Sequence, residues 1–195
     1  MKILAISGTP GVGKSSVGKK LSEVLGVPMI ELSQVVIEKK LYTEFDEERQ
    51  SYVIDEDRVR NFVAEYYRLH GPYVLVSHYA EIAPRDVLEL IVVLRYNPRK
   101  LIDRLRARGW SSRKVAENVE AELLGISTRN AVEEHGEEMV VEIDATGKSV
   151  DDVVNEVLSI VFGEEPRYLG PSIDWFQILD ENELEEVLKF VATNT

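Results

Sequence analysis

The chain has 195 residues, of which 44% are hydrophobic and 30% charged, and its formal net charge is -12. This length allows one α/β domain with small appendages, and the composition is typical of a folded domain rather than a disordered chain. The acidic excess argues against strong electrostatic binding to nucleic acid, whose phosphates it would repel. It fits either a surface charge that maintains solubility or a basic protein partner.

No apolar run approaches the roughly 18 residues that a membrane span needs, and the chain begins with a predicted strand rather than a cleavable signal. We therefore expect a cytoplasmic protein that does not bind membranes. The chain has no cysteine and only three histidines, which excludes disulfides and thiolate zinc sites. Any metal ion is expected to arrive together with a ligand.

The first predicted elements are a short buried strand, "KILAIS", and an amphipathic helix over residues 14–26. Val17, Leu21 and Val24 are expected on the buried face of this helix. A second strand, "PMIEL", follows, and then the segment "YTEFDEERQSY", which has neither the helical nor the strand period. We expect that segment to be mobile or to contact a substrate.

Alternating helices and strands continue almost to the end of the chain. "DEDRVRNFVAEYYRLHG" reads as a helix, residues 97–124 as helices interrupted by "RGWSS", and residues 150–162 as a further helix. Further strands are expected at "YVLVSH", "LIVVLR" and "MVVEIDAT". The first two of these runs are too apolar for a half-exposed sheet, so the pattern predicts about five parallel strands with helices on both faces.

The stretch "GTPGVGKS", from Gly8 to Ser15, matches the pattern G-x-x-x-x-G-K-[ST] between a strand and a helix. Glycines let successive backbone N–H groups converge on an anion, and the positive end of the following helix adds to the attraction. Lys14 can then reach the β- and γ-phosphates of a nucleotide, while the Ser15 hydroxyl binds Mg²⁺. Ser16 can donate to the α-phosphate. The sequence therefore predicts a P-loop nucleoside triphosphate site.

Arginines and one histidine extend this prediction. Arg104 and Arg108 are four residues apart and share a helix face, and Arg113 lies just past the "RGW" interruption. Converging arginines can neutralise a moving phosphoryl group, although the same pattern also occurs in a solvated basic helix. His78 ends an apolar strand and is expected at the carboxyl edge of the sheet, where it could orient a water or a phosphate.

The last segment, residues 163–195, carries eight acidic and two basic side chains and an aromatic cluster, "IDWFQIL". "DENELEEVLKFVA" reads as a capped helix whose apolar stripe is formed by Leu184, Val187, Leu188 and Val191. Trp175 and Phe176 either pack back on the domain or bind a partner. Packing back is the favoured interpretation, because a pair of exposed aromatic side chains promotes aggregation.

Together these residues resemble the adenylate kinase isoenzyme six family, small nucleoside monophosphate kinases linked to ribosome assembly. The matching stretches span about residues 1–162 and are "GTPGVGKSS", "LYTEFDEE", "IDEDRV", "VSH", "VVLR", "LIDRLRARGW" and "AEN". The resemblance implies a kinase domain over 1–162 with a monophosphate-binding segment at about 30–53 and a short lid at about 107–117. It offers nothing for the tail, 163–195.

The family's activity implies transfer of the γ-phosphoryl group from ATP to AMP or another monophosphate, with Mg²⁺ as cofactor and ATP hydrolysis as a side activity. Carried over by position, the ATP-binding residues are Gly11, Gly13, Lys14, Ser15, Ser16, Arg108 and Lys148, the last near the adenine. Lys14, Arg108 and His78 are the expected catalytic residues. The expected substrate-binding residues are Ser33, Tyr52, Arg104 and Arg113.

Val76 departs from the family pattern, because an acidic residue usually stands two positions before the histidine. Mg²⁺ is then expected to be held by Ser15 and water, with Asp55 or Asp57 as a further ligand. A second hypothesis is an ATP-driven assembly factor that binds a basic protein, with kinase activity incidental. The resemblance names small-subunit ribosomal protein eleven as that partner, and the acidic composition motivates the hypothesis.

Overall fold

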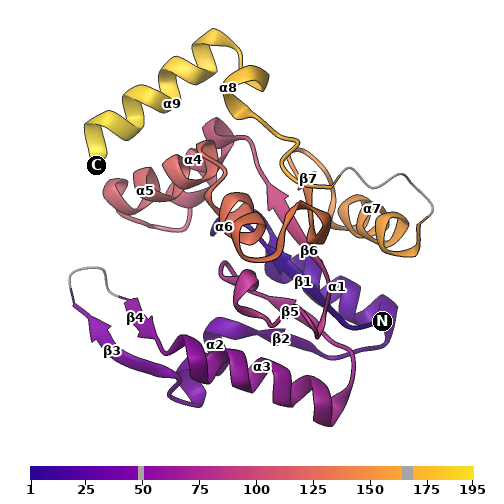
Figure 1. Ribbon diagram of the computed structural model, residues 1–195. Helices are drawn as coiled ribbons and strands as arrows, with labels where there is room; N and C mark the ends of the chain where they lie inside the picture. Colours follow the sequence, from indigo (N-terminus) through magenta and orange to yellow (C-terminus); the bar gives the residue numbers. More distant parts are fainter. Residues whose placement is uncertain (48–50, 164–168) are drawn as a thin grey trace.

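A computed structural model describes residues 1–47, 51–163 and 169–195 of the chain. Its centre is a parallel five-stranded sheet in the order β2-β5-β1-β6-β7, with helices on both sides (Figure 1). The strands of this sheet are β1 (Ile3–Ser7), β2 (Met29–Glu31), β5 (Val74–Val76), β6 (Leu88–Arg95) and β7 (Val140–Asp144). The predicted α/β fold with about five parallel strands is confirmed.

Two groups of helices sandwich the sheet. One face is covered by α1 (Lys14–Leu25), α4 (Pro98–Arg106), α5 (Ser112–Leu123) and α7 (Val150–Phe162). The other is covered by α2 (Leu32–Glu38), α3 (Glu56–His70) and α6 (Ile126–His135). Within the described parts of the chain, no helix combines the length and the apolar character needed to cross a membrane.

Successive side chains of the central strand, β1, point to opposite faces of the sheet, which explains why its sequence is uniformly apolar. Leu4 and Ile6 belong to the core under α1 and α7, whereas Ile3 and Ala5 belong to the core under α2 and α3. Each of the four is fully buried. Both sides of a strand in a covered parallel sheet must be apolar, as observed here.

Helix α1 corrects one expectation. Val17 and Leu21 are buried as predicted, but Val24 is 54% exposed. The buried face of α1 includes Gly18 instead. The helix lies so close to the sheet there that an ideal Cβ on Gly18 would be 2.3 Å from a methyl carbon of Val76. The absence of a side chain at Gly18 therefore lets the helix lie close to the sheet, and Val24 lies outside the contact.

The segment after α2 also differs from the expectation of an irregular stretch. It forms an antiparallel pair, β3 (Tyr42–Asp46) and β4 (Ser51–Ile54), and residues 48–50 of the expected segment lie outside the described residues. The rings of Tyr42 and Phe45 pack on that of Tyr52, with centroids 4.4 and 5.0 Å away. Cross-strand aromatic pairs stabilise the hairpin where the sequence shows no clean alternation.

The described part of the tail, residues 169–195, packs against the rest of the molecule. Gly170 N donates to Val140 O, and the chain then forms α8 (Trp175–Ile178) and α9 (Glu181–Asn194), which lies over α4 and α5 (Figure 1). Trp175 is 1% exposed, so the interpretation that it packs back is confirmed, whereas Phe176 is 45% exposed. In the predicted helical stripe Val187 is buried, but Leu188 is 44% exposed.

Candidate functional site

At its two ends, the loop between β1 and α1 has backbone conformations that residues other than glycine rarely adopt. Gly8 has a φ of +129°, and an ideal Cβ there would lie 2.3 Å from the carbonyl oxygen of Leu94. Gly13 has a φ of +114° and occupies the N-cap position of α1. These conformations curve the loop around the N-terminus of α1, so its amides and the helix dipole act on one volume.

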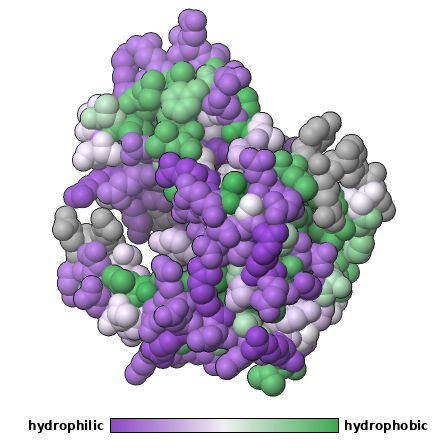
Figure 2. Space-filling view, in the orientation of Figure 1, coloured by the Kyte–Doolittle hydropathy of each residue, from purple (hydrophilic) through white to green (hydrophobic). Residues whose placement is uncertain are grey.

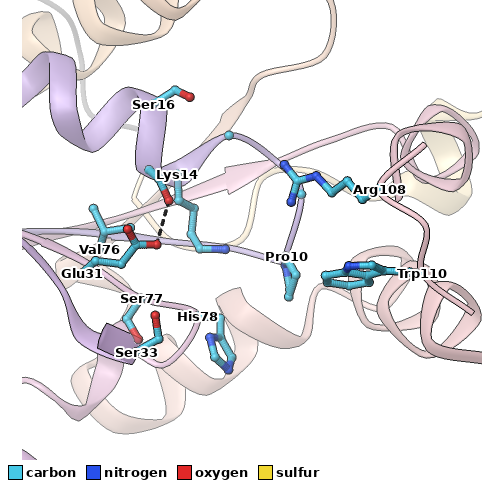
Figure 3. Close-up of a pocket in the computed structure, with 13 residues that line it drawn as sticks. Pro10, Lys14, Ser16, Glu31, Ser33, Val76, Ser77, His78, Arg108 and Trp110 are labelled. Carbon is cyan, nitrogen blue, oxygen red and sulfur yellow. Dashed lines mark hydrogen bonds between the residues drawn. The ribbon is translucent and has the colours of Figure 1, made fainter. Parts of the chain in front are cut away.

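That volume is a cavity of about 370 Å³ at the carboxyl edge of the sheet (Figure 3). It brings together eight residues predicted from the sequence, from four separate parts of the chain. They are Gly11, Gly13, Lys14, Ser15, Ser16, Ser33, His78 and Arg108. Pro10, Glu31, Val76, Ser77 and Trp110 complete the lining.

Lys14 is held inside the curve of its own loop. Its Nζ donates to Gly8 O at 2.7 Å and to Thr9 O at 3.0 Å. Burial lowers its pKa to about 8, although the carboxylates of Glu122 and Glu31 oppose this change and the Arg108 guanidinium adds to it. An anion in the cavity would favour the charged ammonium, so anion binding and protonation of Lys14 would favour each other.

His78 follows β5 at the carboxyl edge of the sheet, as predicted, and its ring borders the cavity (Figure 3). Burial of the ring nitrogens, followed by the charge of Lys14, lowers its pKa to about 4. The side chain is also partly open to solvent, which weakens both effects. Because both effects act in the same direction, the imidazole is neutral at pH 7 and can accept or donate a proton in a hydrogen bond.

Glu31 is a site residue that the sequence reasoning missed. It ends β2, and its carboxylate accepts a hydrogen bond from the Ser15 hydroxyl at 2.9 Å (Figure 3). A hydroxyl beside a carboxylate is the kind of oxygen donor pair that Mg²⁺ prefers, so these residues fit a magnesium site. Only the polar end of an otherwise apolar strand, "PMIEL", could have indicated Glu31.

The expected acidic substitutes for Val76 lie elsewhere. Val76 is 2% exposed and packs against α1. Asp55 caps α3 by accepting from Arg58 N, and Asp57 lies exposed in the first turn of that helix. Neither aspartate lines the cavity, and the position beside Ser15 belongs to Glu31.

Arg108 and Trp110 come from the connection between α4 and α5 and lie across the cavity from Ser16 and Glu31 (Figure 3). The Lys114 ammonium lies 4.6 Å from the centre of the Trp110 ring and supports it. Trp110 was also missed, although it sits in the "RGW" interruption that predicted the lid. The connection thus presents one cation and one aromatic ring to the cavity.

Three predicted residues are not brought to this cavity. The Arg104 guanidinium lies over the Tyr96 ring at 4.6 Å, and Arg113 pairs with Glu117 at 3.2 Å on an exposed surface. Lys148, after β7, pairs with Glu156 at 2.6 Å. Among the described residues that line the cavity, Lys14 and Arg108 are the lysine and arginine side chains.

A second cavity of about 250 Å³ adjoins the first and shares Ser33, Ser77 and His78 with it. Its other walls come from α2, β4 and the segment after β5, and include Tyr52. The lining is mostly apolar, formed by Leu32, Val36, Ile37, Tyr52, Ile54 and Tyr79. The two cavities therefore adjoin at Ser33, Ser77 and His78, and the second has the more apolar lining.

A strand, a glycine-rich loop and a helix in this order, on a parallel sheet, define a P-loop protein. The family model described as "AAA domain" matches residues 4–125. The shikimate kinase from Acinetobacter baumannii in complex with shikimate has a similar fold, with a TM-score of 0.59 at 17% identity over 85% of this chain and 95% of that one. This likeness supports the α/β P-loop fold.

Sequence relatives are more specific. A protein of Saccharolobus islandicus named "Putative adenylate kinase" is 45% identical over 80% of this chain and 82% of its own. A protein of the same name from Pyrococcus furiosus is 37% identical over 92% of this chain and 94% of its own. The chain belongs to this adenylate kinase-like family of P-loop proteins.

Proposed function

We propose that the protein is a nucleoside monophosphate kinase that transfers the γ-phosphoryl group of ATP to AMP or another monophosphate. The observation that carries the proposal is the pair of adjoining cavities. A protein that only binds or hydrolyses ATP needs the first, whereas a transferase also needs a place for the acceptor beside the phosphate loop. Relatives that are named adenylate kinases support the same conclusion.

In this reaction the bond between the γ-phosphorus and the β,γ-bridging oxygen breaks, and an oxygen of the monophosphate forms the new bond. The products are ADP and the acceptor's diphosphate, so AMP yields two ADP. The acceptor oxygen is already ionised at pH 7, and positioning and charge stabilisation suffice. Lys14 and the loop amides hold the donor phosphates, while Arg108 stabilises charge on the moving group.

Ser15 and Glu31 are the residues that would hold Mg²⁺. The ion would neutralise charge on the β- and γ-phosphate oxygens. In the absence of an acid at position 76, the Glu31 carboxylate is the group adjacent to the Ser15 hydroxyl. Water would complete the coordination, since Mg²⁺ usually keeps several water ligands.

The second cavity is the proposed monophosphate site. Its apolar walls suit a nucleobase, and Tyr52 offers an aromatic ring beside it. Ser33, Ser77 and His78 stand where the two cavities meet, so they are placed to orient the acceptor phosphate. His78 also supports the ATPase side activity, because a neutral imidazole can orient a water when no acceptor is bound.

A bisubstrate analogue tests this arrangement. Two adenosines joined by five phosphates should span both cavities and bind about 10²-fold or more tightly than ATP, because the second contact becomes intramolecular. Tyr52→Ala should reduce analogue affinity without changing ATP affinity, and calorimetry measures both. An analogue that binds no more tightly than ATP would refute a second nucleotide site.

The alternative function is an ATP-driven assembly factor for the small ribosomal subunit, with basic ribosomal protein eleven as partner. The supporting observation is the charge of the tail, because α9 and its cap carry five acidic side chains and one lysine. Figure 2 shows hydrophobic side chains among hydrophilic ones over α8 and α9, and Phe176, Ile178 and Leu188 are exposed there. Calorimetry with the purified ribosomal protein, with and without ATP, tests this alternative. Absence of binding at low salt would contradict it.

A further inference from the structure

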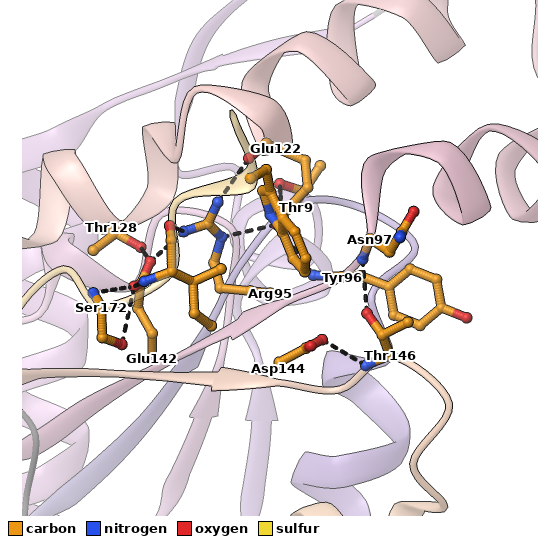
Figure 4. A network of polar contacts seen from close by, with 12 residues as sticks. Thr9, Arg95, Tyr96, Asn97, Glu122, Thr128, Glu142, Asp144, Thr146 and Ser172 are labelled. Atoms are coloured by element: carbon orange, nitrogen blue, oxygen red, sulfur yellow. Dashed lines mark hydrogen bonds and ion pairs between the residues drawn. The ribbon is translucent and has the colours of Figure 1, made fainter. Parts of the chain in front are cut away.

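A buried network of charged groups connects the tail to the phosphate loop (Figure 4). Its centre is the carboxylate of Glu122, on α5, which is 1% exposed. One oxygen, Oε1, accepts hydrogen bonds from Arg95 Nε at 2.8 Å, Tyr96 N at 3.1 Å and Trp175 Nε1 at 2.9 Å. The other, Oε2, accepts from the Thr9 hydroxyl at 2.6 Å. The carboxylate therefore bridges α5, the end of β6, the tail and the phosphate loop.

The tail is built into this network by further contacts. Ser172 N and Ile173 N donate to Glu142 Oε2 at 2.6 and 2.7 Å, and Arg95 pairs with both Glu142 and Glu122. Burial alone would lower the pKa of Arg95, but the two carboxylates more than offset it and raise that pKa. The Arg95 guanidinium thus stays charged, and a buried charge needs all its partners.

Hydrogen bonds link the orientation of the Glu122 carboxylate to the position of Lys14. Three donors fix Oε1, which leaves Oε2 directed at the Thr9 hydroxyl. Thr9 is 3% exposed, and its carbonyl oxygen in turn accepts from Lys14 Nζ. A change in the orientation of Glu122 therefore moves the loop residue that holds Lys14.

We propose that Glu122 and Trp175 are positioning residues of the phosphate loop, so that the C-terminal tail is a working part of the nucleotide site. This inference rests on the proposed function, because it takes the cavity above Lys14 to be the phosphate site. The tail indole supplies one of the three donors that orient Glu122, and Glu122 orients Thr9. The tail is thus required for full nucleotide affinity without touching the nucleotide.

A double-mutant cycle tests the connection. Trp175→Phe keeps an aromatic ring in the core and removes only the N–H donor, and Thr9→Val removes the hydroxyl while keeping the side-chain shape. Each single change is expected to weaken ADP binding by about three- to tenfold, measured by calorimetry, since hydrogen bonds to charged groups are among the stronger ones. In the Thr9→Val background, Trp175→Phe should then change ADP affinity less than about twofold. Thr9→Val has already removed the hydrogen bond through which Glu122 orients the loop.

Two control variants distinguish a loss of phosphate-loop positioning from a general loss of protein stability. Thr9→Ser keeps the hydroxyl donor and should retain ADP affinity close to that of the unmodified protein. Val187→Ala removes buried packing from α9 but none of the hydrogen bonds to the Glu122 carboxylate, so it should lower the melting temperature yet leave ADP affinity unchanged.

The inference is overturned if Trp175→Phe leaves ADP affinity unchanged, if its effect adds fully to that of Thr9→Val, or if Val187→Ala weakens binding equally. Unmodified protein that does not bind ADP at all would instead refute the proposed function. The two failures are therefore distinguishable in one set of titrations.

Discussion

Lys14, the first residue of α1, shows how burial changes the pKa of a side chain. Its pKa is lowered to about 8, mainly because burial removes the ammonium from water, which disfavours the charged form. Bound phosphates favour the charged form, so a bound nucleotide should raise this pKa again. Binding and protonation are consequently linked in the pH range just above neutrality.

We predict that ATP affinity falls as the pH rises through about 8. At that pH about half of the Lys14 side chains are neutral before binding, so complex formation takes up about half a proton. Calorimetry in two buffers of different ionisation heat measures this uptake, and Lys14→Met should abolish it together with most of the affinity. A flat affinity from pH 7 to 9 without proton uptake would contradict the assignment.

Glu31 is predicted to carry the metal dependence of nucleotide binding. Mg²⁺ should increase the ADP affinity of the unmodified protein, and Glu31→Gln should remove about tenfold of that increase because it replaces a charged oxygen ligand with a neutral one. Titrations with Mg²⁺ and with a chelator provide the measurement. Asp55→Asn is the matched control, since that residue caps α3, and it should leave the metal effect intact. An equal metal effect in Glu31→Gln would remove Glu31 from the site.

His78 is predicted to separate hydrolysis from transfer. Hydrolysis requires a water oriented in line with the γ-phosphate, whereas the monophosphate is positioned by its own binding site. His78→Ala should therefore reduce ATP hydrolysis by a larger factor than ADP formation from ATP and AMP. Both rates are measured on one preparation of each protein. Equal losses would make His78 a residue that only positions substrates.

At the scale of elements, the connection between α4 and α5 determines which arginine lines the cavity of the phosphate loop. Arg108 lies at the cavity, whereas Arg104 packs on Tyr96 and Arg113 pairs with Glu117, although all three occur within ten residues of one another. The helical spacing that grouped Arg104 with Arg108 fails because α4 ends at Arg106, so Arg108 already belongs to the connection.

We predict that Arg108→Ala lowers kcat on the order of a thousandfold and changes the Michaelis constant for ATP much less, because the guanidinium acts on charge that develops in the transition state. Arg104→Ala and Arg113→Ala serve as controls and should keep turnover within about threefold. Steady-state kinetics with ATP and AMP distinguish these outcomes. If only the Michaelis constant rises in Arg108→Ala, the side chain contributes to ground-state binding alone.

Helices and strands could be predicted from the sequence where neighbouring residues alone determine them. The phosphate loop, its flanking strand and helix, and the ends of α3 and α7 follow from glycines, caps and apolar periods in the sequence. The β3–β4 hairpin was not predicted, because its stability comes from aromatic contacts across strands rather than from alternation. Glu31 was missed for a related reason, since its role depends on Ser15, sixteen residues away.

At the scale of the whole molecule, the tail is the part that sequence patterns described least. Its cap and its apolar stripe predicted α9, but not the surface against which that helix packs. Charged residues within apolar strands were the available signal, because Arg95 and Glu142 must be paired when buried. The partners, Glu122 and the backbone of residues 172–173, lie too far along the chain for any local pattern to identify them.

The described parts of the chain place a second cavity beside the cavity of the phosphate loop, and Figure 2 shows a hollow between the hairpin and the helices above it. Transfer to a monophosphate is therefore the central claim, and the fate of the γ-phosphoryl group tests it most directly. In a single turnover with ATP labelled at the γ-phosphorus and an excess of AMP, the label should appear in ADP, and Lys14→Ala should prevent this. Label found only in inorganic phosphate, at a rate that AMP does not change, would contradict the account.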